Sequence, residues 1–217
     1  MKLTYFGLYG RAEATRMCLA HAKVEFEDER LSFPEFGALK AAKGPSYQLP
    51  ALEHDGLTMN QSMPILRYVG MQHGYYPMDQ PKLCWAADAT IEDNTDIFAK
   101  APLMVFFGAE KATEEQVKLF EEAGHKYNKH LEAQLADGRK YLAGDKITIA
   151  DFAIFAKIKS IGKNPSPEAV LNQNCLEVYA VMAKIMEDPA YPKVTAWIAN
   201  MEAELADYLS ARPPAPL

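Results

Sequence analysis

The first 46 residues alternate short apolar segments with a helical stretch. Strand-forming residues dominate Lys2–Phe6, and the apolar positions of Glu13–Lys23 have the spacing of a helix. Val24–Leu31 begins by alternating apolar and charged residues, which predicts a half-buried strand. Ser32–Ser46 contains two prolines, so we expect an irregular loop with a short helix there. The pattern therefore predicts the order strand, helix, strand.

A hairpin and a second helix complete this part of the chain. Strands are expected at Leu49–Glu53 and Leu57–Met59, because the dipeptide Asp55-Gly56 between them is a strong hairpin signal. A helix is expected to begin at Ser62 and to end near residues 70–73. The predicted order, β-α-β followed by β-β-α, is that of a small α/β domain.

The pattern changes at a proline-rich segment. Tyr76–Pro81 contains two prolines, which can continue neither a helix nor a central strand. Helical periodicity dominates beyond it, and helices are expected at Leu83–Phe107, Glu114–Leu135, Ile149–Gly162, Glu168–Glu187 and Tyr191–Leu209. The sequence thus predicts an α/β domain at residues 1–76, a linker at 77–81 and an all-α domain at 82–217.

One helix start and the end of the chain carry clear local signals. Thr148 and Asp151 have the spacing of a capping box, and Ile147 can pack on Phe152 beside it. These residues indicate a folding role and a helix in the core of the second domain. The proline-rich tail Arg212–Leu217 is expected to fray.

The composition argues against several function classes. Of the 217 residues, 49% are hydrophobic and 24% charged, which is typical of a globular protein. A net charge of −6 argues against a nucleic-acid binder and against attraction to an anionic membrane. No apolar run reaches the roughly 18 residues of a membrane span. Because charged Arg11 and Glu13 follow the mildly apolar start, we expect a cytoplasmic protein.

Cysteine and histidine spacings give no metal or disulfide signal. Cys18, Cys84 and Cys175 lie too far apart for a zinc ribbon or a C-x-x-C pair, and an odd number excludes a complete disulfide framework. A reducing compartment is the simpler interpretation. The five histidines lack metal-ligand spacing, and no G-x-S-x-G, P-loop or G-x-G-x-x-G motif occurs. We expect neither a metal site nor a serine-type triad.

Four groups of polar positions are expected to meet at one edge of the predicted sheet. They are Tyr5 at the end of the first strand, Arg11 at the start of the next helix, Gln48-Leu49-Pro50 before the third strand, and Gln61-Ser62 before the last helix. Ligands of α/β sheets tend to bind where strand ends meet helix starts. Each residue alone has an ordinary structural interpretation, so only the set points to a ligand site.

The residue types in this set suit an anionic, peptide-like ligand. Ser62 can cap a helix whose free amides form an anion site, and Gln61 can add a hydrogen bond. Pro50 keeps Leu49 extended, so the Leu49 backbone can pair with a peptide ligand as an added strand. The Tyr5 hydroxyl can donate to a thiolate, which lowers the pKa of that thiol.

Four blocks of the sequence share a further pattern. They are Lys2–Phe6 with Gly10–Glu13, Gln48–Glu53 with Asp55-Gly56, Gln61-Ser62 with Ile65–Tyr68, and Leu142–Asp145 with Thr148–Phe152. Together they resemble the cytosolic glutathione transferases of the tyrosine type, with sigma the nearest class and some alpha and mu character. The resemblance spans nearly the whole chain. It implies a thioredoxin-like first domain, an all-helical second domain and a homodimer that binds reduced glutathione.

The resemblance also implies roles for single residues. Tyr5 matches the hydroxyl that stabilises the glutathione thiolate, with Tyr9 as an alternative if the strand register differs. Arg11 matches a structural and electrostatic residue near the thiolate. Within Gln48-Leu49-Pro50, Leu49 matches the backbone partner of the cysteinyl unit.

The two ends of glutathione have candidate partners as well. Gln61 and Ser62 match the residues that bind the γ-glutamyl group, and either Lys40 or Lys43 is expected to meet the glycyl carboxylate. An acidic residue of the partner subunit reaches the γ-glutamyl amine in this family. Asp96 is the candidate here.

Asp93 is the alternative to Asp96 for this contact. The second substrate is expected to be a small hydrophobic electrophile in an apolar cleft between the domains. Leu8, Met104 and Phe107 are candidate wall residues.

Two positions depart from the family pattern. Sigma relatives that isomerise prostaglandin carry a tryptophan where Phe33 stands, which argues against that role here. Alpha, mu and pi relatives carry an aromatic dimer contact where Ser46 stands, and Tyr47 is one residue late. The sequence therefore does not predict the aromatic type of dimer contact.

The principal hypothesis is a glutathione transferase whose thiolate attacks an apolar electrophile. The alternatives are a non-catalytic carrier or structural protein of the same fold, and a narrow-specificity glutathione-dependent isomerase. A thiol–disulfide oxidoreductase would need a cysteine near the first helix start. Tyr5–Arg11 contains none, and Cys18 lies more than a turn into the helix.

Overall fold

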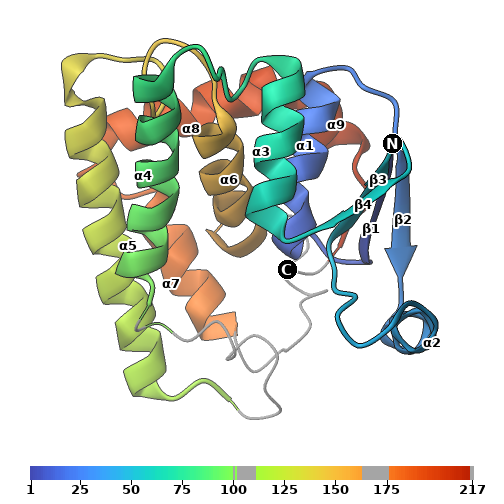
Figure 1. Cartoon of the computed structure of the whole chain (residues 1–217). Helices are drawn as coiled ribbons and strands as arrows, with labels where there is room; N and C mark the ends of the chain where they lie inside the picture. The colour runs from blue at the N-terminus through green and yellow to red at the C-terminus, as the bar shows by residue number, and fades with distance from the viewer. Residues whose placement is uncertain (100, 102–110, 163–175, 216–217) are drawn as a thin grey trace.

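The computed structural model describes residues 1–99, 101, 111–162 and 176–215 (Figure 1). Its N-terminal part contains a four-stranded sheet in the order β2-β1-β3-β4. The strands are β1 (Lys2–Phe6), β2 (Glu27–Leu31), β3 (Ala51–His54) and β4 (Leu57–Asn60). β1 is parallel to β2 and antiparallel to β3, and β3 is antiparallel to β4. Asp55 and Gly56 both have positive φ in the turn, as the predicted hairpin requires.

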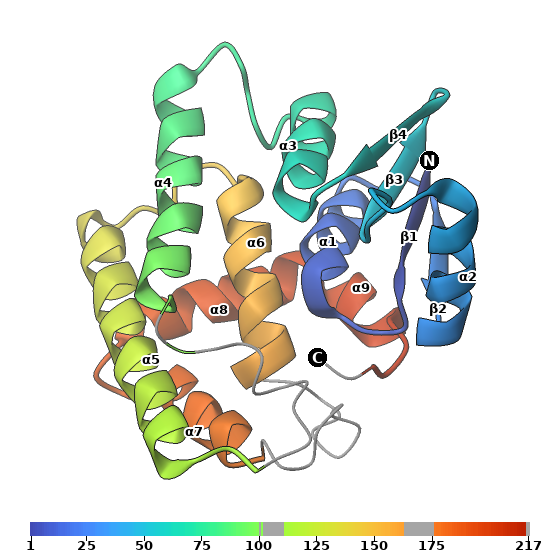
Figure 2. The same ribbon diagram turned by 60° about the horizontal axis from the view of Figure 1, so that its bottom comes forward.

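Three helices accompany the sheet. α1 (Glu13–His21) follows a 3₁₀ turn at Gly10–Ala12 and packs against α3 (Ser62–His73). Figure 2 shows α1 and α3 on the side of the sheet that faces the remaining helices, with α2 (Phe33–Lys43) on the far side. α2 occupies most of the predicted loop, because Ser32 and Glu35 form a capping box that fixes its start.

The C-terminal part is helical over the residues that the structure describes. Its helices are α4 (Pro81–Ile97), α5 (Glu114–Gln134), α6 (Ile149–Lys157), α7 (Leu176–Met186), α8 (Pro192–Glu204) and α9 (Ala206–Ala211). α6 lies between α4 and α1 (Figures 1 and 2) and also contacts α3 and α8. Its residues from Ile149 to Ala156 are all buried. α6 therefore joins the helical part to the helices of the sheet.

The predicted capping box at the start of α6 is confirmed. The Asp151 carboxylate accepts hydrogen bonds from the Thr148 amide at 2.9 Å and the Thr148 hydroxyl at 3.1 Å. The Leu142 amide and the Trp197 indole, each at 2.9 Å, complete the set. Burial raises the pKa of Asp151, and these four donors oppose that shift. Asp151 thus ties three segments to one buried helix start.

Several predicted boundaries differ from the structure. β2 begins at Glu27 rather than at residue 24. α4 begins at Pro81 rather than at residue 83, because proline is well tolerated in the first turn of a helix. It ends at Ile97. The helix predicted for residues 191–209 is two helices, which meet at Leu205. Residues 102–107 and 168–175 of two other predicted helices lie outside the described residues.

The prediction of a frayed tail is wrong for its first residues. Arg212 and Ala215 are buried. The Arg212 guanidinium donates to the Glu13 carboxylate at 2.5 Å and lies 4.0 Å from the centre of the Tyr9 ring. Charge pairing holds this segment although its prolines form no helix. Among the described residues, no helix combines the length and apolarity that crossing a membrane requires.

Candidate active site

The Tyr5 hydroxyl lies at the start of the first helix. Tyr5 is the last residue but one of β1, is 7% exposed, and accepts a hydrogen bond from the Arg11 backbone amide at 3.2 Å. Gly10 has a φ of +40°, and a Cβ there would lie 2.8 Å from the Tyr5 hydroxyl oxygen. Because the oxygen accepts from an amide, the hydroxyl proton remains available for a further acceptor.

Arg11 contributes its backbone to this arrangement. Its side chain is exposed, and the structure gives it no hydrogen bond or ion pair with a described residue. The Arg11 guanidinium is therefore free to take a ligand contact. Tyr9, the alternative hydroxyl, is buried and donates to the Pro213 carbonyl at 3.2 Å. The structure thus leaves Tyr5 as the available hydroxyl of this loop.

A buried arginine that the sequence analysis missed holds the loop between β1 and α1. Arg16 donates to the Leu8 carbonyl at 2.7 Å and to Asp28 at 2.9 Å. Its guanidinium carbon lies 5.8 Å from the centre of the Tyr5 ring. An arginine among the apolar residues of α1, three positions after Glu13, is the signal that could have indicated it.

Glu13 connects this loop to the C-terminal tail. Its carboxylate is fully buried and accepts from Arg212 at 2.5 Å and from the Tyr208 hydroxyl at 3.0 Å. Arg16 lies 3.5 Å from the second carboxylate oxygen. Burial, and after it the nearby Glu13 charge, raises the pKa of the Tyr208 hydroxyl. The buried charges are paired with one another, as the low-dielectric interior requires.

The strand entry and the start of α3 face the same edge of the sheet. Leu49 and Pro50 are joined by a cis peptide bond, and the Gln48 carbonyl accepts from Asn60 at 2.5 Å. The predicted cap at Ser62 is wrong by one residue, because Gln61 is the N-cap and Ser62 begins the helix. The reason is backbone geometry: Gln61 adopts a left-handed φ of 75° and ends the extended segment.

That backbone conformation is itself a signal of a ligand site. A non-glycine residue at positive φ costs roughly 1–3 kcal/mol, and such residues cluster where ligands are held. The Gln61 side chain is exposed, and the Ser62 hydroxyl has no partner among the residues described. The first amides of α3 are free as well, so this helix start can accept an anion.

The two candidate lysines of α2 differ in their partners. Lys43 lies 3.6 Å from the Glu53 carboxylate and above the Tyr47 ring. Lys40 lies 5.8 Å from the centre of the Phe36 ring and has no acidic partner within the described part of the chain. Lys40 therefore carries the less compensated charge.

The two candidate acids of α4 also differ. Asp93 lies 3.1 Å from the His130 ring. Asp96 is exposed, and its carboxylate has no partner among the described residues. Of the candidate wall residues, Leu8 is buried, whereas Met104 and Phe107 lie outside the described residues.

The cysteines in the described ranges do not offer a nucleophile. Cys18 is fully buried, and burial raises the pKa of its thiol. Cys84 is buried, donates to the Pro77 carbonyl at 3.1 Å and also has a raised pKa. Both are protonated thiols at neutral pH, in contrast to the thiolate of an oxidoreductase. Within residues 1–99, 101, 111–162 and 176–215, no group of three metal-binding side chains occurs.

Comparison with known proteins identifies the family. Residues 1–71 match the model "Glutathione S-transferase, N-terminal domain", and residues 95–212 match "Glutathione S-transferase, C-terminal domain". The chain belongs to the glutathione S-transferase family. The expected fold, a thioredoxin-like domain followed by a helical one, is confirmed by these matches and by the observed sheet and helices.

Relatives of this glutathione transferase support the enzymatic assignment. Glutathione S-transferase 1 of Ascaris suum is 37% identical over 92% of this chain and 95% of its own length. Human hematopoietic prostaglandin D synthase is 32% identical over 70% of this chain and 74% of its own length. The crystal structure of the glutathione S-transferase from Ascaris lumbricoides has a TM-score of 0.79 and 28% identity, covering 100% of this chain and 98% of that one. The chain is an enzyme that transfers glutathione, as the sequence analysis predicted.

Proposed function

We propose that the enzyme is a tyrosine-type transferase of the sigma class, in which the Tyr5 hydroxyl donates a hydrogen bond to the glutathione thiolate. One observation carries this proposal: the Arg11 amide donates to the Tyr5 oxygen at 3.2 Å, so the hydroxyl proton is left for a ligand. This chain is similar in sequence to human hematopoietic prostaglandin D synthase. Because the relatives that isomerise prostaglandin belong to the sigma class, this similarity supports the sigma assignment.

The mechanism follows from thiol chemistry. A free thiol has a pKa of about 8.5 and is mostly protonated at neutral pH. A donated hydrogen bond and the adjacent start of α1 both favour the thiolate, and each unit of pKa is worth about 1.4 kcal/mol. The exposed Arg11 guanidinium adds positive charge nearby. The thiolate sulfur then forms a bond to an electrophilic carbon that the enzyme holds beside it, and the leaving group of that carbon, chloride in the case of 1-chloro-2,4-dinitrobenzene, departs with the bonding electron pair.

Glutathione lies along the edge of the sheet. Its γ-glutamyl carboxylate binds the free amides and hydroxyl at Ser62, with Gln61 beside them. Its cysteinyl unit pairs with the Leu49 backbone within Gln48-Leu49-Pro50. Lys40 meets the glycyl carboxylate, since Lys43 already faces Glu53.

The electrophile binds between two domains. Residues 1–76 form the glutathione-binding domain, 77–81 the linker, and 82–217 the helical domain that supplies the electrophile site. Leu8, which is buried beside the Tyr5 loop, forms part of its apolar wall. Phe33 is exposed and packs on Phe6 with ring centres 4.7 Å apart, so an aromatic ring is present without the tryptophan of prostaglandin-isomerising relatives. Conjugation is therefore the favoured reaction.

The enzyme acts in the cytoplasm as a homodimer. Trp85 is 72% exposed on α4. Asp96 follows eleven residues later, about three helical turns, so both occupy one face of α4. A partner subunit that covers Trp85 receives the Asp96 carboxylate in its glutathione site. Asp93 is less suited because it faces His130 of its own chain.

The test is conjugation of reduced glutathione to 1-chloro-2,4-dinitrobenzene, with wild type beside Tyr5→Phe and Tyr9→Phe. Loss of the Tyr5 hydroxyl is expected to lower kcat/KM at pH 6.5 at least tenfold, while Tyr9→Phe stays within about twofold, following the tenfold-per-1.4 kcal/mol relation. Equal losses in both variants, or an unaffected Tyr5→Phe, would exclude Tyr5 as the activating group.

A further inference from the structure

Arg16 places a buried positive charge against the ring of the proposed catalytic tyrosine. Its side chain on α1 is 1% exposed, and its guanidinium carbon lies over the Tyr5 ring, 5.8 Å from the ring centre. A cation within about 6 Å of the centre of an aromatic ring is attracted to the face of that ring. The contact therefore favours one position of the Tyr5 ring.

The same guanidinium holds the loop that connects β1 to α1. Its Nη1 donates to the Leu8 carbonyl at 2.7 Å and to the Tyr9 carbonyl at 3.4 Å. The turn at Gly10–Ala12 follows directly, and the Arg11 amide within it donates to the Tyr5 hydroxyl. One side chain thus contacts both the ring and the loop whose amide meets the hydroxyl.

Arg16 is itself held from two sides. Its Nε donates to the Asp28 carboxylate on β2 at 2.9 Å, and the other oxygen of that carboxylate accepts from Arg30 at 2.8 Å. The Glu13 carboxylate lies 3.5 Å from Nη1. Charge-assisted hydrogen bonds of this kind are strong and directional. The sheet and the start of α1 therefore fix where the guanidinium lies.

One nitrogen of the guanidinium has no hydrogen bond in this arrangement. Nη2 of Arg16 is buried and has no hydrogen-bond partner among the described residues. An unpaired buried donor is costly, and attraction to the Tyr5 ring offsets part of that cost. The contact with the ring is therefore part of what keeps the charge at this position.

We propose that Arg16 is a positioning residue for the transferase reaction, which holds the Tyr5 ring and its loop so that the Tyr5 hydroxyl stays aimed at the glutathione thiolate. The buried side chain acts through Tyr5 and does not touch substrate. This inference rests on the proposed role of Tyr5. Lysine does not replace this arginine, because an ammonium lacks the planar fork that reaches Leu8 and Asp28 together.

The first test is Arg16→Lys, which keeps the charge and removes the fork. The thiol pKa of bound glutathione, followed by thiolate absorbance, is expected to rise by about half a unit, because the Tyr5 hydroxyl is less well aligned. Below that pKa, half a unit leaves about threefold less thiolate, so kcat for 1-chloro-2,4-dinitrobenzene is expected to fall about threefold at pH 6.5. The KM for glutathione is expected to stay within about twofold.

Asp28→Asn reaches the same contact from the other side. Asp28 is partly exposed, so the substitution is tolerated, and the Nε contact of Arg16 loses its charge assistance. The thiol pKa is expected to rise in this variant too, by less than in Arg16→Lys. Asp28→Asn therefore tests the proposal even if Arg16→Lys does not fold.

A double variant decides whether Arg16 acts through Tyr5. In the Tyr5→Phe background, Arg16→Lys is expected to leave the thiol pKa unchanged, because the hydroxyl that Arg16 positions is gone. A shift of the same size in both backgrounds would mean that Arg16 acts on the thiolate without Tyr5. That result would overturn the proposal.

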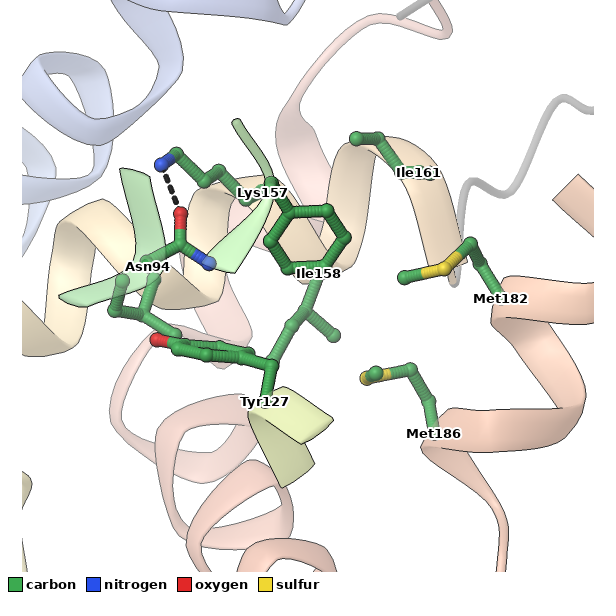
Figure 3. Close-up of a pocket in the computed structure, with 9 residues that line it drawn as sticks. Asn94, Tyr127, Lys157, Ile158, Ile161, Met182 and Met186 are labelled. Carbon is green, nitrogen blue, oxygen red and sulfur yellow. Dashed lines mark hydrogen bonds between the residues drawn. The ribbon is translucent and has the colours of Figure 1, made fainter. Parts of the chain in front are cut away.

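Two controls separate positioning from lost stability. Arg67→Lys removes the fork of an arginine that pairs with Asp88 at 2.8 Å between α3 and α4. Met186→Ala enlarges the cavity between α4, α5, α6 and α7, where Figure 3 shows Met186 in the wall. Both variants are expected to lower the melting temperature and to leave the thiol pKa unchanged, since neither residue contacts the Tyr5 loop in the described structure.

The outcomes distinguish this inference from the proposed function. If Arg16→Lys and Asp28→Asn lower the melting temperature but leave the thiol pKa unchanged, Arg16 has a structural role only and the inference is wrong. A raised thiol pKa in Tyr5→Phe would leave the proposed function intact in that case. If Tyr5→Phe also has an unchanged thiol pKa, both proposals are wrong.

Discussion

Tyr5 keeps its hydroxyl at the helix start because residue 10 has no side chain. Gly10→Ala is expected to displace the Tyr5 ring, since the new Cβ would lie 2.8 Å from its oxygen at a φ of +40°. We expect at least a tenfold loss in kcat/KM for conjugation and a stability loss of about 1 kcal/mol from the positive φ. Steady-state kinetics and urea unfolding measure the two effects.

The matched control is Gly7→Ala. A Cβ at Gly7 meets nothing within 4 Å, and Gly7 does not adopt positive φ, so its activity is expected to stay near that of wild type. If Gly10→Ala is as active as Gly7→Ala, the close approach at Tyr5 has no functional consequence.

Single residues were predictable only where their signal is local. The capping box at Thr148 and Asp151 depends on four neighbouring residues, and the structure confirms it. The start of α3 at Ser62 was predicted correctly, whereas its cap was misplaced by one residue, because the side chains give no sign that Gln61 adopts positive φ. Arg16 was missed because its partners Leu8 and Asp28 are brought to it by the tertiary fold.

At the level of elements, the loop that carries Tyr5 depends on the C-terminal tail. Arg212→Gln is expected to destabilise the protein by about 3 kcal/mol, because it leaves the buried Glu13 carboxylate short of its strongest partner. Without this ion pair the loop between β1 and α1 is less firmly held, so the thiol pKa of bound glutathione is expected to rise. Urea unfolding and thiolate absorbance measure the two effects.

Arg139→Gln controls for the loss of an arginine. Arg139 pairs with Asp137 at the surface at 2.6 Å, where solvent screens the pair, so the unfolding midpoint is expected to change little. Equal stability of the two variants would mean that the tail does not anchor the loop.

Element order followed from the sequence, whereas element ends did not. Apolar periodicity and the Asp55-Gly56 turn identify the strands and α1, because these signals repeat along the segment itself. The break between α8 and α9 at Leu205 could not be predicted, because no glycine or proline marks it in the sequence. The anchored tail depends on Glu13, which lies 199 positions before Arg212 in the sequence.

At the level of the whole molecule, Glu204 joins distant parts of the chain. Its carboxylate accepts from the Tyr141 hydroxyl at 2.6 Å and from Lys140 at 3.1 Å, and it lies 3.4 Å from the His21 ring on α1. The Tyr141 and Lys140 hydrogen bonds lower the pKa of Glu204 from 4.5 to about 2. Acid titration of Glu204 therefore measures how much its contacts with Tyr141, Lys140 and His21 stabilise the fold.

The sign of the pH effect follows from that lowered pKa. Ionised Glu204 stabilises the fold above pH 4.5, and this contribution is lost as the pH falls toward about 2. After allowance for a side chain that is 29% exposed, Glu204→Gln is expected to cost roughly 1–2 kcal/mol at pH 6 and little near pH 2.5. Urea unfolding at both pH values checks this. A difference in unfolding free energy between wild type and Glu204→Gln that does not shrink in acid would contradict this account.

The proposed dimer makes a prediction for Asp96. Asp96→Ala is expected to weaken glutathione binding about fivefold, the loss of roughly 1 kcal/mol from one charge-assisted hydrogen bond at a wet interface. Calorimetry measures the affinity, and sedimentation confirms the oligomeric state. Asp145→Ala, an exposed acid in the loop before α6, controls for the change in net charge. Identical affinities in the two variants would remove Asp96 from the site.

The most direct test of the central claim is the ultraviolet absorbance of enzyme-bound glutathione, titrated between pH 5 and pH 10. In wild type, the thiolate band is expected to develop at least one unit below the roughly 8.5 of a free thiol, and Tyr5→Phe is expected to return it toward that value while calorimetry shows that glutathione still binds. A thiol pKa that is the same in wild type and Tyr5→Phe would contradict the assignment of Tyr5 as the group that creates the nucleophile.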